Sequence, residues 1–422
     1  MQRLTPVLDK VVIAALFVFV AFSMFSISIA QIAAGLGGIA WLWRAHLTDS
    51  WREQRWFLWI PFGLYILACL IAVANAYDVS YSYQSLKKLL EILIFFWVIN
   101  CVRENRLRNS LVLVLVIAAT TAGLFGFYQG WRDGVSNATR VEGTMSVYMT
   151  FAGLLMMVAL LTLARLMFKR PQEIWFWFFM VVMSACLVLT QTRQAWFGFL
   201  VSFCFLLFMR RKKYLLILAT LGFSAIMLVM GPIKKQIQSM PELGGPSLID
   251  QLKYRLHNQL KYRLVSMIQG NDYTFTMRKA IWRGGWEIFK DYPVTGCGFK
   301  CVDLVNSQYS DPTGLVERLR GMHNNFLQLA VDTGILGLSA WLGIWFCFFR
   351  LLRKRTLALE GEPSDRWVLF GSAAAVIGFL GGGFFETNFY DSEVAMVLYF
   401  IMALPFAGSQ NEDVRNVKPS PG

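Results

Sequence analysis

The sequence predicts an all-α polytopic membrane protein with about twelve transmembrane helices and one large, mainly helical outer loop. The first observation is composition: 56% of the 422 residues are hydrophobic and only 16% are charged, which is too apolar for a soluble protein of this length. The second is a series of long apolar runs, separated by short loops rich in Lys and Arg. The third is a single long polar interruption, from Gly231 to His323.

The apolar runs set the number of spans. The first run, Val11 to Trp43, is too long for one helix, so we divide it near Ser26 to Ser28. No small-residue cleavage site follows its start, which indicates a retained first span rather than a signal peptide. Ten further spans are predicted by hydropathy at 56–75, 86–102, 110–129, 146–168, 174–190, 195–209, 214–231, 335–352, 367–385 and 394–408.

The distribution of basic residues predicts the orientation. One set of loops collects Arg44, Arg52, Arg55, Arg103, Arg106, Arg108, Arg165, Lys169, Arg170, Arg210, Arg211, Lys212, Lys213, Arg350, Arg353, Lys354, Arg355 and Arg366, whereas the opposite short loops hold only Arg132, Arg140 and Arg193. The positive-inside rule therefore places both termini in the cytoplasm and the long loop outside, in the periplasm of a Gram-negative cell. The same rule accounts for most of the net charge of +14, so no nucleic-acid partner is expected.

This orientation divides the chain into four segments. Residues 1–231 form transmembrane helices one to nine, and residues 232–324 form the periplasmic loop. Residues 325–408 form the last three transmembrane helices, and residues 409–422 form a cytoplasmic tail.

The outer loop contains an expected amphipathic helix from Pro246 to Ile268. The five-residue string Leu-Lys-Tyr-Arg-Leu occurs at 252–256 and again at 260–264, so its leucines and its basic residues each return to similar sides of a helix. Such a helix either lies on anionic headgroups or packs on the loop's own core, and the sequence leaves both possibilities open.

Two more helices are expected in this region. Met277 to Phe289 carries Arg278 and places Trp282 and Trp286 four residues apart on one face. A third helix is expected to open at His323 and to stop at Gly334, before the next span.

Most of the seven cysteines lie inside apolar runs, where a thiol packs as a small hydrophobe. Only Cys297 and Cys301 fall together outside the predicted spans. Their spacing permits a disulfide in an oxidising compartment, but the sequence does not decide whether it forms. A zinc site is disfavoured because no companion ligands flank the pair.

Three side chains carry the predicted chemistry on the outer face: Arg193, Arg278 and His323. Arginine stays charged and makes bidentate hydrogen bonds to phosphate oxygens, so Arg193 and Arg278 are the candidate diphosphate ligands. Histidine accepts a proton near neutral pH, so His323 is the candidate base or acceptor-orienting group. A structural histidine that caps a helix or forms a hydrogen bond is an equally open interpretation of His323.

Five further residues are secondary candidates for the site: Lys87, Lys88, Arg140, Gln194 and Asn324. Snorkelling at the membrane interface is the favoured interpretation of the two lysines and Arg140. His46 and His257 are poorer candidates than His323, because one lies in a cytoplasmic loop and the other among the lysines of the surface helix.

Three strings, in order, resemble the O-antigen ligase and polymerase superfamily. They are Gln191-Thr192-Arg193-Gln194-Ala195-Trp196, then Met277-Arg278-Lys279-Ala280-Ile281-Trp282 with Pro293-Val294-Thr295-Gly296-Cys297-Gly298-Phe299, then His323-Asn324-Asn325-Phe326 with Gly334-Ile335-Leu336-Gly337. The resemblance covers roughly residues 190–350, and the flanking spans agree only in number and hydropathy.

The resemblance implies a GT-C-like membrane glycosyltransferase of the bacterial inner membrane, acting in lipopolysaccharide biosynthesis with its active site facing the periplasm. In the ligase branch, O-antigen moves from undecaprenyl diphosphate to the lipid A–core oligosaccharide, among membrane lipids. The polymerases and the protein O-oligosaccharyltransferases are the alternatives within the superfamily. The second alternative is disfavoured because only Asn411 to Gly422 follows the last span.

The predicted reaction is an inverting displacement that needs neither a metal nor another cofactor. No carboxylate pair of the glycosidase kind and no Asp-x-Asp motif can be singled out in the loop. If a cation were required, the outer acidic residues Glu386, Asp391 and Glu393 would be the first place to search.

Two rival functions come from other classes. A secondary transporter is expected to place ionisable residues near the bilayer midplane and to show two related halves, and the sequence has neither feature. A structural membrane protein stays open as an alternative, because motifs alone do not prove turnover.

Gly371, Gly378 and the run 381–383 are interpreted as helix-packing sites rather than a nucleotide-binding loop, because no strand precedes them.

Overall fold

The computed structural model describes residues 4–135, 139–169, 173–211, 273–305, 308–309, 321–358 and 365–408. These residues form helices and their connections, and no strand occurs among them. The predicted span at 214–231, the amphipathic helix from Pro246 to Ile268 and His257 lie outside the described residues.

The helices follow the predicted spans closely. Before the loop they are α1 (Thr5–Phe22), α2 (Ile27–Leu47), α3 (Trp59–Ala74), α4 (Val79–Ser85), α5 (Leu93–Cys101), α6 (Asn105–Asp133), α7 (Tyr148–Phe168), α8 (Trp175–Leu189) and α9 (Arg193–Arg210). After it come α12 (Tyr273–Asp291), α13 (Val302–Val305), α14 (Asn325–Ala358), α15 (Arg366–Gly382) and α16 (Ser392–Ala403). Short 3₁₀ turns are η1 (Ser50–Glu53), η2 (Leu86–Ile92) and η5 (Leu404–Phe406). The predicted division of the first run is confirmed, because Ser26 is the N-cap of α2 and its hydroxyl accepts a hydrogen bond from the Ile29 amide.

Among the described residues, four helices are long and apolar enough to cross a membrane: α1, α6, α7 and α14. Four more apolar helices are shorter, namely α3, α8, α15 and α16 with its 3₁₀ extension. The chain is thus all-helical with several apolar helices, as expected for an α-helical membrane protein.

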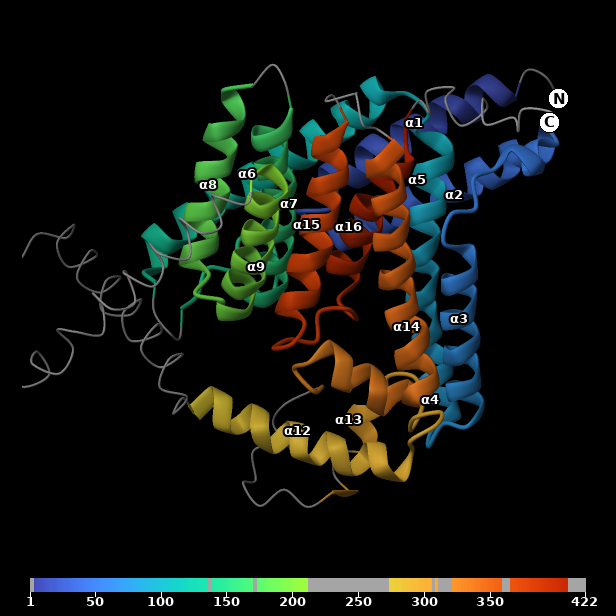
Figure 1. The fold of residues 1–422 in the computed structure, drawn as a ribbon, viewed down its shortest axis with the longest axis vertical. Coiled ribbons are helices and arrows are strands. Elements are labelled where there is room, and N and C mark those ends of the chain that lie inside the picture. Colours follow the sequence, from blue (N-terminus) through green and yellow to red (C-terminus); the bar gives the residue numbers. More distant parts are fainter. Residues whose placement is uncertain are drawn as a thin grey trace, which may run out of the picture.

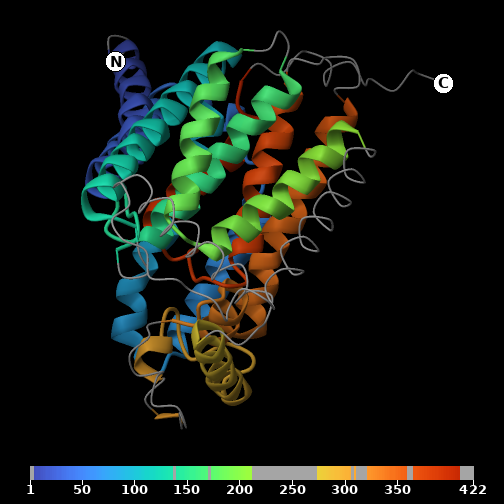
Figure 2. The same cartoon turned by 90° about the vertical axis from the view of Figure 1, so that its left-hand side faces the viewer.

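The helix α7 forms the centre of the bundle, and every residue from Thr150 to Leu166 is buried. It packs against α8, α9 and α15, as Figures 1 and 2 show from two sides. Glycines make the closest crossing possible: a β-carbon on Gly198 of α9 would lie 2.3 Å from the carbonyl oxygen of Gly378 on α15. The predicted packing role of Gly378 is therefore confirmed.

One end of the bundle carries a layer formed by α12, α13, α4 and the first part of α14 (Figure 1). This layer has a small core of its own that includes Ile281 and Ile288 of α12 and Met322 before α14. Trp282 is half-buried, whereas Trp286 is exposed. The buried stripe of α12 is formed by Ile281, Gly285 and Ile288.

The helix α14 contains a break at Gly334, where φ is 63° and ψ is −165°. The segment 293–298 fills this break. The amides of Ile335 and Leu336 donate to the carbonyls of Pro293 and Val294, and the amides of Cys297 and Gly298 donate to those of Val331 and Asp332. Glycine is required at the break because a β-carbon there would lie 2.2 Å from the Val294 carbonyl oxygen.

The opposite end of the bundle is basic. Arg55 and Arg108 donate to the carbonyls of residues 406–408, and Arg355 donates to the Pro405 carbonyl. These are carbonyls that the last helical turn leaves without an intrahelical partner. Arg108 also pairs with Asp365, with 2.6 Å between Nη2 and Oδ1. The loops that were predicted to share one side therefore meet at one end of the fold.

The crossing of α9 and α15 gives a testable prediction. Gly198→Ala should lower the melting temperature of the purified protein, because overpacking a tight contact costs about 1–3 kcal/mol. Gly63→Ala on α3 is the matched control, since nothing lies within 4 Å of a β-carbon at that position. We expect the control to hold or raise the melting temperature, and an equal loss in both variants would contradict the packing argument.

Candidate active site

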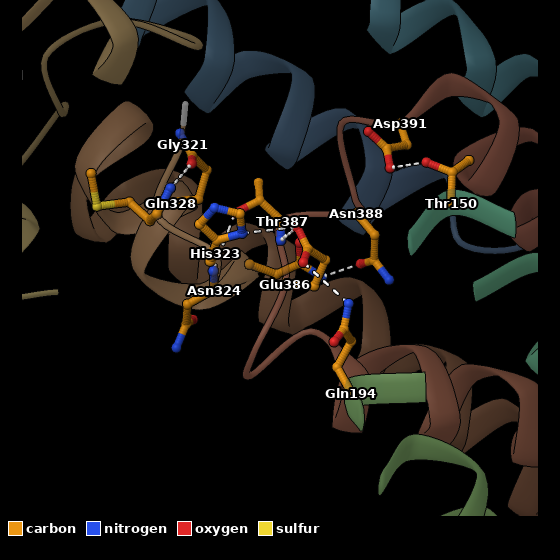
Figure 3. A network of polar contacts seen from close by, with 12 residues as sticks. Thr150, Gln194, Gly321, His323, Asn324, Gln328, Glu386, Thr387, Asn388 and Asp391 are labelled. Carbon is orange, nitrogen blue, oxygen red and sulfur yellow. Dashed lines mark hydrogen bonds and ion pairs between the residues drawn. The ribbon is translucent and has the colours of Figure 1, made fainter. Parts of the chain in front are cut away.

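Three segments that are distant in the sequence meet around the Glu386 carboxylate (Figure 3). Glu386 lies in the connection between α15 and α16 and is 8% exposed. Its Oε2 accepts a hydrogen bond from Gln194 Nε2 of α9 at 3.2 Å, and its Oε1 lies 3.2 Å from Nδ1 of His323. The carboxylate therefore joins the segment that carries Arg193 to the segment that carries His323.

His323 lies before α14 rather than at its start. The helix begins at Asn325, so the expectation that His323 opens it is wrong by two residues. Asn324 is the cap, because its Oδ1 accepts hydrogen bonds from the amides of Phe326 and Leu327 at 2.9 and 3.0 Å. His323 therefore does not cap the helix. Its φ of 45° places its backbone in the left-handed region.

Backbone strain recurs at the other motif. Gln191 also has a positive φ, 51°, in the turn directly before Arg193. Non-glycine residues in this region cost about 1–3 kcal/mol, and they persist where the surrounding structure holds them in place. Two of the three strings that resemble the family therefore contain a residue in this uncommon conformation.

The two asparagines after His323 bind the α15–α16 connection. The Asn324 amide donates to the Thr387 hydroxyl at 3.2 Å, and the Asn325 side chain donates to Asn388 Oδ1 at 2.8 Å. The Asn325 side-chain Oδ1 accepts from the Phe389 amide at 3.1 Å. These contacts join the residues that follow His323 to the residues that follow Glu386.

The geometry also assigns the two imidazole nitrogens. An ionised carboxylate only accepts hydrogen bonds, so Nδ1 of a neutral His323 carries the proton and Nε2 keeps its lone pair. The side chain of His323 is 17% exposed, so the ring is not sealed inside the protein. This arrangement can accept a proton at Nε2.

The two candidate arginines lie on different helices. Arg193 is the first residue of α9 and immediately precedes Gln194. Arg278 lies on α12 one helical turn before Trp282, whose indole nitrogen donates to the Met322 carbonyl at 2.9 Å. Arg278 lies four residues before Trp282 and therefore on a similar side of α12. Both arginine side chains are half-buried.

The secondary candidates lie in different environments. Arg140 stacks on the Tyr148 ring, with 4.4 Å between the guanidinium carbon and the ring centroid. Lys88 donates to the Tyr390 carbonyl and to the Ser392 hydroxyl, and Lys87 is exposed. Gln194 and Asn324 are the two that take part in the network around Glu386 and His323.

Residues 178–342 match a family model described as O-antigen ligase. This match supports membership of the O-antigen ligase and polymerase superfamily. No curated protein matches it. The matched range contains Arg193, Gln194, Arg278, His323 and Asn324, so membership supports a membrane protein of the ligase and polymerase type that acts on lipid-linked glycans.

Glu386 lies outside the range that matches the superfamily, and sequence reasoning missed its contact with His323. From the sequence, Glu386 is expected only as a metal ligand, if a cation were required. The available signal was the polar string Glu386-Thr387-Asn388 between two apolar helices, two residues after a run of three glycines. A polar string at the end of a membrane helix is common, so only the fold reveals its partners.

Cys297 and Cys301 form a disulfide, with 5.9 Å between their α-carbons. Asp332 is fully buried beside them, and its carboxylate accepts hydrogen bonds from the Val302 amide and from Gln328 Nε2. These three residues are the one group of potential metal ligands among the described residues, and both sulfurs are already used in the disulfide.

Asp391 gives a prediction about pH. Burial raises the pKa of its carboxyl from 3.8 to about 7, with further contributions from Glu386 and Glu393, whereas its hydrogen bond from Thr150 and the charge of Lys88 oppose the shift. Between about pH 4 and pH 7 the unfolded chain ionises Asp391 while the folded chain keeps the proton, so folding stability should fall as pH rises through this window. Melting temperatures at pH 5 and pH 7.5 test this.

The matched variant is Asp391→Asn, which retains an oxygen to accept from Thr150 Oγ1 and has no proton to lose. We expect the variant to lose part of the difference in melting temperature between the two pH values. If the wild type and the variant changed equally with pH, Asp391 would not be the group responsible.

Proposed function

We propose that this protein is an O-antigen ligase. It transfers O-antigen glycan from undecaprenyl diphosphate to the lipid A–core oligosaccharide at the periplasmic face of the inner membrane. The observation that carries the proposal is the Glu386 carboxylate, which holds the possible base His323 beside the segment of Arg193. Membership of the superfamily supplies the class of reaction.

The proposed topology has twelve spans, with both termini in the cytoplasm and the site in the periplasm. The basic end of the bundle, with Arg55, Arg108 and Arg355, lies opposite the layer that contains α12 and the start of α14 (Figure 1). Cysteine labels near His323 should react with an impermeant reagent from outside the inner membrane, and labels near Arg353 should be protected. The reverse pattern would rule out a periplasmic site.

The proposed reaction is a single inverting displacement. The acceptor hydroxyl oxygen bonds to the anomeric carbon, the bond from that carbon to the diphosphate oxygen breaks, and the diphosphate leaves with the electron pair. His323 Nε2 takes the hydroxyl proton, and Glu386 holds the Nδ1 proton in place. Arg193 and Arg278 stabilise the negative charge that develops on the diphosphate, so the reaction needs no metal ion.

A deletion strain distinguishes the ligase from the polymerase. Loss of all O-antigen from the core, with polymer accumulating on the carrier lipid, supports the ligase. A core that carries one repeat unit would identify a polymerase and refute the proposed acceptor. Complementation with the wild-type chain is the control for both outcomes.

Arg193 and Arg278 should each be required for transfer. Alanine substitution should abolish activity in purified protein while the melting temperature stays close to that of the wild type. Lysine should rescue poorly, because a point charge does not reproduce the bidentate hydrogen bonds of a guanidinium. Exposed Arg283 on the same helix as Arg278 is the matched control, and its alanine variant should retain activity. Full activity of Arg193→Ala or Arg278→Ala would remove that residue from the mechanism.

His323→Ala should lower the transfer rate by about 10² to 10⁴-fold, the usual range for removal of a general base. Glu386→Gln keeps the size of the side chain but lets an amide donate to Nδ1, which favours the wrong tautomer, so its rate should fall by about 10-fold to 10⁴-fold. The substitutions act on one unit, so the double variant should be little worse than His323→Ala alone.

Glu393→Gln is the control for the loss of a nearby negative charge. Binding of the carrier lipid and the melting temperature are measured on the same preparations. If His323→Ala lost stability but kept the turnover of the folded protein, the histidine would be structural. If it lost carrier binding together with rate, a protonated His323 would be a third diphosphate ligand.

A further inference from the structure

Two buried polar side chains on the first part of α14 form a chain of hydrogen bonds that ends beside His323. Asp332 is fully buried, and Gln328 is 3% exposed. Gln328 Nε2 donates to Asp332 Oδ2 at 2.8 Å, and Gln328 Oε1 accepts from the amide of Met322 at 2.8 Å. Met322 directly precedes His323 in the chain, and Figure 3 shows Gln328 beside this segment. The proposed reaction uses neither side chain, although burying polar groups is costly.

Asp332 is held at its other side by the disulfide segment. Its Oδ1 accepts a hydrogen bond from the Val302 amide at 3.2 Å and lies 3.7 Å from Cys301 Sγ. Cys301 is joined to Cys297, whose amide donates to the Val331 carbonyl of α14. The disulfide segment therefore keeps the carboxyl group of Asp332 in place, on the side away from Gln328.

The partners of Gln328 assign the orientation of its amide. The Asp332 oxygen accepts and the Met322 amide donates, so the NH2 group of Gln328 faces Asp332 and its oxygen faces Met322. The reversed amide would place two donors together at Met322 and two oxygens together at Asp332. Gln328 thus links the position of the Asp332 carboxyl group to the backbone before His323.

The backbone at Met322 is bonded in both directions. Its amide donates to Gln328, and its carbonyl accepts from the Trp282 indole of α12 at 2.9 Å. The next residue, His323, has a φ of 45°, an uncommon conformation that persists where the surrounding structure holds it. The hydrogen bond from Met322 to Gln328 is therefore one of the contacts that hold His323 in this conformation.

We propose that Gln328 and Asp332 are positioning residues for the transfer reaction. They act through the backbone of Met322 and His323, and they direct the imidazole toward Glu386, whose Oε1 lies 3.2 Å from Nδ1. This inference rests on the proposed function, because it assigns both residues to the reaction of His323. A displacement of about 1 Å at a reacting group can lower a rate by about 10²-fold, so the loss of such a contact is measurable.

Asp332→Asn tests the direction of the hydrogen bonds. The new amide can keep its oxygen on the Val302 N–H, which turns its NH2 group toward the NH2 group of Gln328, so two donors meet. We expect kcat for transfer to fall by about 10-fold to 10²-fold while the KM for the donor stays the same, since only the position of the base changes. The melting temperature of the same preparation reports separately on folding.

Gln328→Glu, added to Asp332→Asn, restores the network with its direction exchanged. The new carboxylate accepts both from the new amide and from the Met322 N–H, so every group has a partner again. The pair also keeps the total charge of the wild-type pair. We expect kcat of the double variant to recover by about tenfold or more relative to Asp332→Asn. A double variant no faster than Asp332→Asn would overturn the inference.

A spectroscopic measurement reports on the imidazole without turnover. The chain has three histidines, so nitrogen NMR of isotope-labelled histidine gives few signals, and those of His323 are the ones lost in His323→Ala. The signals of His323 should show a proton on Nδ1 in the wild type, should shift in Asp332→Asn and should return in the double variant. Unchanged signals in Asp332→Asn would contradict a positioning role.

Gln129→Glu is the matched control for a new carboxylate on a glutamine position. Gln129 Oε1 accepts from the amides of Glu142 and Gly143, and a carboxylate keeps both of these hydrogen bonds. This variant should retain both the transfer rate and the signals of His323. Equal losses in Gln129→Glu and in Asp332→Asn would overturn the inference.

The outcomes separate this inference from the proposed function. If a protein without transferase activity still showed the shift of the His323 signals and its reversal, the link to His323 would stand and the ligase would be refuted. Normal transfer in Asp332→Asn with unchanged signals would refute the positioning role alone. A lower melting temperature with a normal kcat of the folded protein would make the pair structural and also overturn the inference.

Discussion

The candidate site depends on the need of one buried carboxylate for hydrogen-bond donors. A carboxylate with little contact with water is costly unless donors surround it. The hydrogen-bond donors around Glu386 are Gln194, His323 and the amide of Thr387. Because these donors come from three segments, satisfying the carboxylate also brings the three segments together. The same hydrogen bonds that stabilise the fold here therefore orient the imidazole.

A second constraint, the break in α14 at Gly334, supports the arrangement around the Glu386 carboxylate. The break in α14 at Gly334 gives up intrahelical hydrogen bonds, and the segment 293–298 replaces them with its own backbone groups. Gly296 is needed in that segment because a β-carbon would lie 2.3 Å from the backbone of Asp332. This pairing explains why the strings around Gly296 and Gly334 occur together in the chain. It also gives the start of α14 its own direction, apart from the apolar remainder of the helix.

The two ends of the bundle differ in the way that they use charge. At one end, Arg55, Arg108 and Arg355 satisfy carbonyls at the close of α16, which is a structural use of arginine. At the other end, polar side chains bind one another across loops, and Gln191, Lys300 and His323 hold left-handed backbone conformations. A cavity of about 610 Å³ lies beside α2.

The sequence by itself determined the helical membrane class, the positions of the apolar helices and the three strings that identify the superfamily. Those properties depend on local hydropathy, on helix periodicity and on residue order, which a single chain displays directly. Only the tertiary structure decided that Glu386 contacts His323, that Asn324 rather than His323 caps α14, and that Trp286 is exposed. These facts depend on which segments meet across long sequence separations and on the exact helix start. Neither the spacing nor the composition of one segment contains that information.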